Sequence, residues 1–191
     1  MTVLIAGLLL FLGVHSIRIV ADPWRQQQLM RWGENTWKGI YSLISIAGLA
    51  LIVIGYSAAR LQPVVLWYPP AGMRHLAALL TLIAFILIAA AYVPRNIIKA
   101  RLVHPMILGI KVWALAHLFA NGTLADVILF GAFLVWAIVD FRSARRRQAV
   151  AANAANPTVV ATVATLVIGV AVWAIFAFYL HEFLMGVRPF A

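Results

Sequence analysis

Six runs of apolar residues follow one another along this 191-residue chain. A helix rises about 1.5 Å per residue, so roughly 20 mainly apolar residues cross the hydrocarbon core of a bilayer. Within that core every backbone polar group must be hydrogen-bonded inside its own segment, which favours helices. The predicted fold is therefore all-α, an integral membrane protein with six transmembrane helices at residues 3–17, 39–59, 76–93, 105–120, 127–139 and 158–180.

Composition supports the same class and excludes several kinds of site. The chain is 65% hydrophobic and 10% charged, with a mean hydropathy of +0.99, which is too apolar for a soluble domain. It contains no cysteine, which excludes disulfides, thiolate-bound metals, iron–sulfur clusters and covalently attached c-type haem. Any haem in this chain would be held non-covalently, by residues such as histidine.

The runs divide a single predicted domain into three parts. Residues 1–147 form a five-helix part, 148–157 an Ala- and Asn-rich flexible link, and 158–181 the last helix. Inside the first part, residues 21–37 are polar, and we expect them to lie as a helix on the membrane surface. Asn121-Gly122 is a turn between two short, antiparallel spans.

The distribution of Lys and Arg predicts the orientation, because cytoplasmic loops carry an excess of them. The predicted cytoplasmic side receives eleven: Arg18, Arg25, Arg31, Lys38, Arg95, Lys99, Arg101, Arg142, Arg145, Arg146 and Arg147. The other side receives three, namely Arg60, Arg74 and Arg188. This predicts an inner-membrane protein with both termini outside the cytoplasm, and it explains the basic charge by membrane topology, so that we expect no nucleic-acid partner.

The five histidines are the main candidates for chemistry, because polar groups in hydrocarbon are costly and often functional. His15 and His117 fall inside predicted spans, where each is either a buried structural imidazole or a ligand. The other three lie at predicted span ends, where an interfacial role is the simpler interpretation: His75, His104 and His181.

Spacing limits which histidines can act together. His104 and His117 are thirteen residues apart, which at about 100° and 1.5 Å per residue puts them on nearly opposite helix faces and about 20 Å apart. One iron cannot bind both from a straight helix. Depth in the membrane instead pairs His15 with His104 and His117 with His75.

Lys111 lies within a predicted span and is open to two interpretations. Its ammonium could pair with an anionic group such as a haem propionate. Alternatively, its stem could extend toward the cytoplasmic side, where Asp140 ends the facing arm of the hairpin.

Small residues within the first two spans leave the assembly state open. Gly7, Gly13, Gly48 and Gly55 allow close approach of helices, either within one chain or between two copies in a homodimer.

Several motifs together resemble the NnrU family. They are His15-Ser16, the stretch from Gly33-Glu34 to Tyr41-Ser42, Pro69-Pro70 followed by Arg74-His75, Lys99-Ala-Arg101-Leu-Val-His104-Pro105-Met106, and Trp113-Ala-Leu-Ala-His117-Leu-Phe-Ala-Asn121-Gly122. They extend over most of the chain.

The resemblance implies a multi-spanning inner-membrane protein required for expression of nitrite and nitric oxide reductase during denitrification. The domain is shared with 15-cis-ζ-carotene isomerase, which resembles a haem b enzyme. It implies haem b bound within the bundle, with His15 and His117 as iron ligands. We add His104, Arg18 and Lys111 as further candidate cofactor-binding residues; no catalytic residue is assigned.

Three functional hypotheses follow. The first is a haem-binding protein with a redox role in denitrification or in isomerisation of a lipophilic polyene. The second is a non-enzymatic accessory protein that assists expression or maturation of nitrite or nitric oxide reductase and contacts their components. The third is a methyltransferase, because the stretch from Arg101 to Gly109 is similar to a motif of isoprenylcysteine-type enzymes. Membrane lipids are partners in all three.

Overall fold

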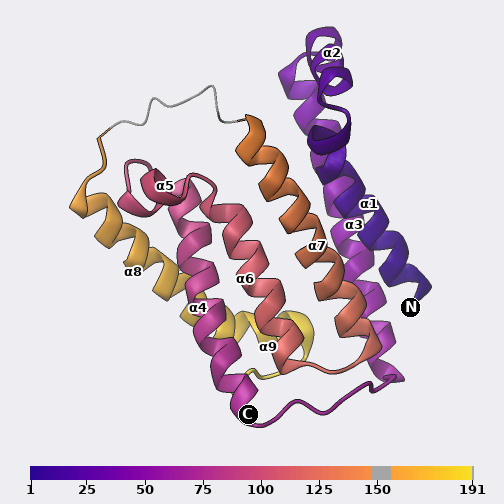
Figure 1. Cartoon of the computed structure of the whole chain (residues 1–191). Helices are drawn as coiled ribbons and strands as arrows, with labels where there is room; N and C mark the ends of the chain where they lie inside the picture. The colour runs from indigo at the N-terminus through magenta and orange to yellow at the C-terminus, as the bar shows by residue number, and fades with distance from the viewer. Residues whose placement is uncertain (148–155, 191) are drawn as a thin grey trace.

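The chain folds into helices joined by short connections, and the computed structural model describes residues 1–147 and 156–190 (Figure 1). Across these two ranges there is no strand, and Val65 and Thr123 form one isolated antiparallel bridge. The helices are α1 (Thr2–Val20), α2 (Asp22–Trp32), α3 (Glu34–Leu61), α4 (Gly72–Tyr92), α5 (Ile97–Leu102), α6 (Pro105–Ala120), α7 (Leu124–Arg147), α8 (Val159–Ile175), the π-helical turn η2 (Phe176–Leu180) and α9 (His181–Met185).

The predicted all-α membrane fold is confirmed. In the described part of the chain, five helices are long and apolar enough to cross a bilayer: α1, α3, α4, α7 and α8 with its continuation to Met185. The remaining predicted span, residues 105–120, is α6, which is apolar but only 16 residues long. The predicted span 127–139 was too short, because hydropathy stops at Asp140 whereas the helix continues to Arg147. Arginine is a good helix former, so a basic segment can extend a helix beyond the membrane.

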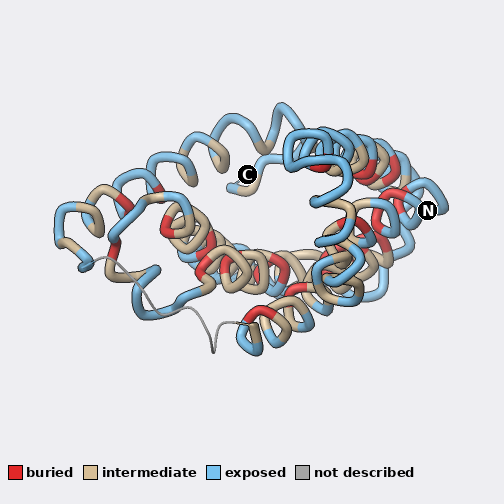
Figure 2. The backbone as a smooth tube through the Cα atoms, turned by 90° about the horizontal axis from the view of Figure 1, so that it is seen from above, coloured by how far each residue is buried: buried red, intermediate tan, exposed pale blue. Residues whose placement is uncertain are grey.

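The long helices lie side by side along a curved row, in the order α3, α1, α7, α6, α4 and α8 (Figure 2). Consecutive members of this row pack against each other, and α3 and α8 are its two ends. A hydrogen bond from Arg60 Nη1 to the Met185 carbonyl, 2.6 Å long, links the end of α3 to α9.

Three of the four glycines pack α1 against α3 within one chain. A Cβ on Gly7 would lie 2.6 Å from the Ile52 backbone nitrogen, and one on Gly48 would lie 2.8 Å from that of Phe11. A Cβ on Gly55 would overlap the backbone of Leu4. Gly13 has nothing within 4 Å of such a Cβ. The small residues therefore serve the internal contact, which accounts for three of them without a second copy.

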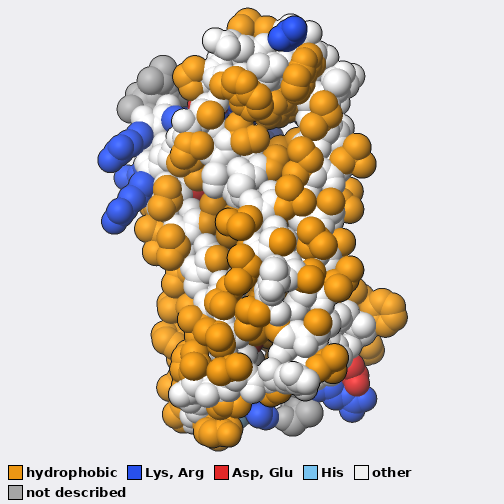
Figure 3. All heavy atoms as spheres, turned by 90° about the vertical axis from the view of Figure 1, so that its right-hand side faces the viewer, with side chains coloured by type: hydrophobic (Ala, Val, Ile, Leu, Met, Phe, Trp, Pro, Cys, Tyr) orange, Lys and Arg blue, Asp and Glu red, His pale blue; other side chains and the backbone are white. Residues whose placement is uncertain are grey.

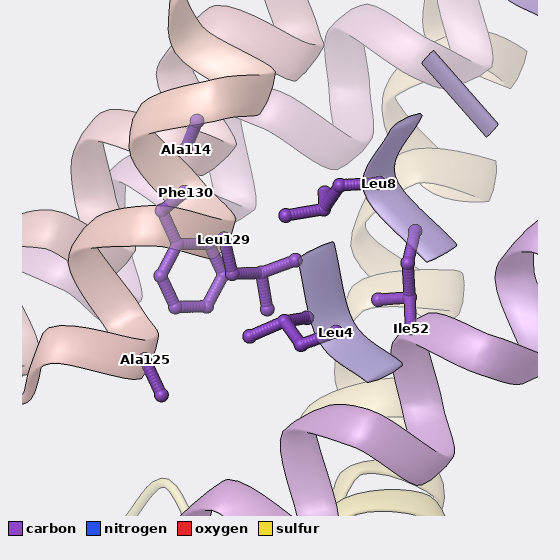
Figure 4. Packing of buried hydrophobic residues seen from close by; sticks show 7 residues of the cluster. All are labelled: Leu4, Leu8, Ile52, Ala114, Ala125, Leu129 and Phe130. Carbon is purple, nitrogen blue, oxygen red and sulfur yellow. The ribbon is translucent and has the colours of Figure 1, made fainter. Parts of the chain in front are cut away.

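A small apolar cluster joins α1 and α3 to α6 and α7. Its buried members, shown in Figure 4, are Leu4, Leu8, Ile52, Ala114, Ala125, Leu129 and Phe130. The side chains around this cluster include Phe11 and Trp113, which lie one turn from His15 and His117 respectively. Packing here therefore fixes the two helices that hold those histidines.

Charge separates the bundle into two ends with an apolar belt between them (Figure 3). The basic end carries α2, α5 and the last turn of α7 with Arg145, Arg146 and Arg147 (Figure 1). The opposite end carries both termini and Arg60, at the last turn of α3. The predicted surface segment is helical as α2, and most of the predicted link, residues 148–155, lies outside the described residues.

The turn before α7 is held by a close backbone contact. The Gly122 carbonyl accepts hydrogen bonds from Leu66 N (2.8 Å) and Trp67 N (3.2 Å). Because a Cβ on Gly122 would overlap the Trp67 carbonyl, Gly122→Ala is expected to lower the free energy of unfolding by about 1–3 kcal/mol. Thermal unfolding in detergent measures this. Gly39→Ala, at a helical glycine with open space around its Cβ position, is the control and should be neutral or slightly stabilising.

Candidate functional site

A large cavity lies at the basic end of the bundle, and we call it the basic-end cavity. Its volume is about 1010 Å³, at the top of the range of roughly 300–1,000 Å³ usual for small-molecule sites. Residues of α1, α2, α3, α7 and the segment from α5 to α6 line it. His15 of α1 and His104, which precedes α6, are both on its wall. These are the two histidines that depth in the membrane pairs, and they line one cavity.

His15 is held by its own helix and by aromatic neighbours. Its Nδ1 lies 2.7 Å from the Phe11 carbonyl, and a carbonyl only accepts, so Nδ1 carries the proton. The ring stacks on Phe11 at 4.2 Å and contacts Tyr41 at 5.1 Å and Trp136 at 6.0 Å between centroids. A backbone bond that fixes one ring nitrogen is the usual arrangement for a histidine that ligates metal through the other.

His104 has a buried nitrogen without a partner. Within the described residues, its Nε2 makes no hydrogen bond, and neither does Nε1 of Trp136 on the same cavity wall. Buried polar atoms are normally hydrogen-bonded, so each exception requires a reason. Burial lowers the pKa of His104 below its usual value, which keeps the imidazole neutral at pH 7, the form that binds metals.

The walls of the basic-end cavity are positively charged. Five cations line it, against the two carboxylates Glu34 and Asp140: Arg18, Arg25, Lys38, Lys99 and Arg147. Lys38 pairs with Glu34 at 2.7 Å and Arg147 with Asp140 at 3.7 Å. Among the described residues, the Arg18 and Lys99 side chains have no carboxylate partner. The cavity thus has positive charge to spare for an anionic ligand.

Lys111 does not line the basic-end cavity. Its Nζ sits 3.8 Å from the centre of the Phe141 ring, in a cation–π contact. Asp140, the alternative partner, pairs with Arg147 instead. The Lys111 stem therefore extends toward the expected end of α7, but its ammonium contacts Phe141 and forms no ion pair with Asp140. The aromatic face of the next residue takes the charge, since a ring quadrupole attracts an ammonium ion without desolvating a carboxylate.

His117 belongs to a second cavity, which we call the opposite-end cavity. This cavity has a volume of about 540 Å³ and is lined by residues of α4, α6, α8, η2, α9 and the segment after α9. His181, not His75, is the second histidine on its wall, and His75 is exposed. Depth in the membrane pairs His117 with His75, but His75 is exposed and does not line this cavity, although its neighbour Arg74 does.

Aromatic rings fill the space between His15 and His117. His15 stacks on Phe11, Phe11 contacts Phe133 at 5.8 Å, Phe133 contacts Trp113 at 5.5 Å, and Trp113 contacts His117 at 5.0 Å. The structure does not bring these two histidines to one cavity.

A buried carboxylate at the start of α7 was missed in the sequence. Asp126 is 4% exposed. Its Oδ1 accepts from the Tyr56 hydroxyl at 2.5 Å, and its Oδ2 accepts from Thr123 N at 2.9 Å and Thr123 Oγ1 at 2.6 Å. The Thr-x-x-Asp spacing just before an apolar run, a variant of the capping box, is the signal that could have found it.

Removing that carboxylate tests how much the network stabilises the bundle. Asp126→Ala leaves three donors without their acceptor, namely the Tyr56 hydroxyl, Thr123 N and Thr123 Oγ1. Each that stays buried without a partner is expected to cost about 1–3 kcal/mol. Tyr56→Phe in the same chain removes one of these donors, so the double variant should unfold less easily than Asp126→Ala alone. Unfolding in increasing SDS measures both. Equal stability of wild type and Asp126→Ala would contradict this account.

Comparison with known families decides the identity of the fold. The family model described as NnrU protein matches residues 3–189. The chain belongs to the NnrU family. The match includes both cavities and every histidine. Neither the curated proteins nor the solved structures give a match.

Within this NnrU-family chain, the described residues contain no group of three or more His, Cys, Asp and Glu that could hold a bare metal ion. A haem makes a smaller demand, because its porphyrin supplies four ligands and the protein only the axial ones. The basic-end cavity fits such a group by its size, its two histidines, the partnerless Nε2 of His104 and its surplus of positive charge.

Proposed function

We propose that this NnrU-family protein binds haem b in the basic-end cavity, with His15 and His104 as iron ligands and Arg18 beside the propionates. One observation supports this above the others: two histidines from separate parts of the chain line one large, positively charged cavity. Compared with the family-based pair, His104 replaces His117, which lies beyond a row of aromatic rings.

The chain's own residues would perform distinct tasks at such a site. The Phe11 carbonyl fixes the proton of His15 on Nδ1 and so presents Nε2. Burial keeps His104 neutral. Arg18 and Lys99 offset the negative charge of propionates, since charge-assisted bonds to carboxylates are among the strongest available. When bound, haem b would supply an iron that takes up and releases one electron.

An absorption spectrum of the purified protein is the direct test. We expect protein produced with ample haem to show an intense Soret band that shifts on reduction with dithionite. A colourless, folded protein under those conditions would remove the haem proposal. It would leave the non-enzymatic accessory role, with structural histidines, as the better hypothesis.

We propose that the redox role serves denitrification in the inner membrane, with the basic end facing the cytoplasm as the Lys and Arg excess favours. A deletion strain grown on nitrate should lose nitrite or nitric oxide reductase activity, and wild-type protein should restore it. Restoration by His104→Ala, expressed to the same level, would show that haem binding is not what the reductases need. An unaffected strain that accumulates a cis-polyene would instead favour the isomerase role.

A further inference from the structure

The opposite-end cavity has the features of a second ligand site, separate from the proposed haem site. Aromatic side chains make up much of its wall, among them Phe85, Trp113, Trp173 and Phe176. Trp173 is oriented by a hydrogen bond from its Nε1 to Thr81 Oγ1, 3.1 Å long. A volume of about 540 Å³ between aromatic faces suits a flat ring, because rings stack favourably on one another.

Two imidazoles are among the polar groups of this cavity, together with Arg74, Thr81, Asn121, Glu182 and Arg188. His117 Nδ1 lies 2.8 Å from the Trp113 carbonyl, and His181 Nδ1 lies 2.8 Å from the Val187 carbonyl. Because a carbonyl oxygen only accepts a hydrogen bond, Nδ1 of each neutral ring carries the proton, and Nε2 keeps a lone pair that can only accept. In both rings the bond described above is made by Nδ1, and Nε2 makes no hydrogen bond to any described residue. The two rings therefore offer two acceptors to a ligand that carries donors.

The helix that carries His181 contains a π-helical turn directly before this residue. The turn η2, Phe176–Leu180, is π-helical and ends where His181 begins α9. Trp173, Ala177 and His181, spaced four residues apart, lie on the face of this helix that lines the cavity. Single π turns within α-helices occur frequently at functional sites.

The segment after α9 covers the cavity from outside. Arg188 Nε donates to Glu182 Oε1 at 2.8 Å, and Phe190 contacts Trp173 at 6.0 Å and Phe178 at 5.2 Å. Arg188 and Glu182 thus pair with each other on the cavity wall, which Arg74 also lines. On its other side the cavity borders α8. In the helical stretch Val159–Met185, only 11% of the most apolar segment is buried within the chain.

We propose that the opposite-end cavity binds the dihydroxy ring of a hydroquinone, as carried by membrane quinols, with its two hydroxyls donating to Nε2 of His117 and His181. The aromatic walls hold the ring, and the two acceptors distinguish it from a hydrocarbon of the same shape. The proposal concerns binding only and does not depend on haem in the basic-end cavity.

Intrinsic fluorescence of Trp113 and Trp173 reports on binding. Purified wild type is titrated under anaerobic, reducing conditions with a decyl-substituted hydroquinone, with its O,O-dimethyl ether and with unsubstituted hydroquinone. The dimethyl ether is expected to bind at least about tenfold more weakly, because it cannot donate. Tighter binding of the decyl compound than of the plain ring indicates a membrane quinol as the source, and equal binding indicates a soluble dihydroxy compound.

Protein variants complete the test. His117→Phe and His181→Phe keep a ring but remove the acceptor, so each should weaken hydroquinone binding roughly tenfold and leave the ether unchanged. His75→Phe, at an exposed histidine outside the cavity, should bind as wild type. His181→Gln, which retains an acceptor, should recover part of the affinity and guards against a variant that fails to fold.

Three results would overturn the proposal. They are equal affinity for hydroquinone and its ether, no saturable binding of either, and loss of a haem Soret band in His117→Phe or His181→Phe. The last result would mean that the cavity takes a porphyrin. It is distinguishable from failure of the basic-end haem site, because that site depends on His15 and His104 instead.

Discussion

His15→Ala and His104→Ala should each abolish stable haem binding in protein that is otherwise folded. The expected loss of affinity exceeds the ~10–100-fold that follows removal of a mere outer partner of a metal ligand, because the axial bond itself disappears. The measurement is the ratio of Soret absorbance to protein absorbance after purification with ample haem. His117→Ala should keep the wild-type ratio, since that ring lies in the opposite-end cavity.

Small ligands separate loss of the iron bond from loss of the fold. Added imidazole can occupy the space that His15→Ala or His104→Ala leaves, so it should restore haem binding to both variants. His104→Gln, by contrast, fills that space without a good ligand and should stay pale with imidazole. If His117→Ala lost haem and His104→Ala retained it, the pair implied by the family resemblance would be correct, and the aromatic row between His15 and His117 would have to rearrange on binding.

The helices could be predicted from the sequence because hydrocarbon allows so few alternatives. Long uncharged runs can satisfy their backbone only as helices, and α1, α3, α4 and α8 follow those runs closely. The end of α7 could not be located in this way, because hydropathy reports where the membrane ends and not where the helix ends. The basic residues up to Arg147 belong to the helix but not to the apolar run.

The site was predictable only as far as depth along a helix determines it. Depth placed His15 and His104 at one level, and they share a cavity. It could not reveal that His181 shares the cavity of His117, because depth along a helix does not determine which helices pack around a cavity. Depth also could not decide whether Asp140 or Phe141 is the partner of Lys111. Adjacent residues of a helix lie at nearly the same depth, but their side chains point in different directions.

Gly55→Val is expected to be the most destabilising single change in the membrane-embedded part of the fold. Even the first carbon of the new side chain would overlap the backbone of Leu4, which no side-chain rotation can relieve. Overpacking costs about 1–3 kcal/mol where side chains can move and more where backbone must shift. Here α1 would have to move away from α3, and Leu4, fully buried in the core cluster, would move with it.

Gly13→Val is the matched control, because it adds the same side chain to a helical glycine with nothing within 4 Å. Both proteins are compared by thermal unfolding in detergent, and only Gly55→Val should unfold at a clearly lower temperature. Since His15 is on α1 and the glycines hold α1 against α3, Gly55→Val should also lower haem content, with both histidines intact. Unchanged stability of Gly55→Val would show that α1 and α3 are not packed through these glycines, and the contact between α1 and α3 would then no longer explain how His15 reaches the basic-end cavity.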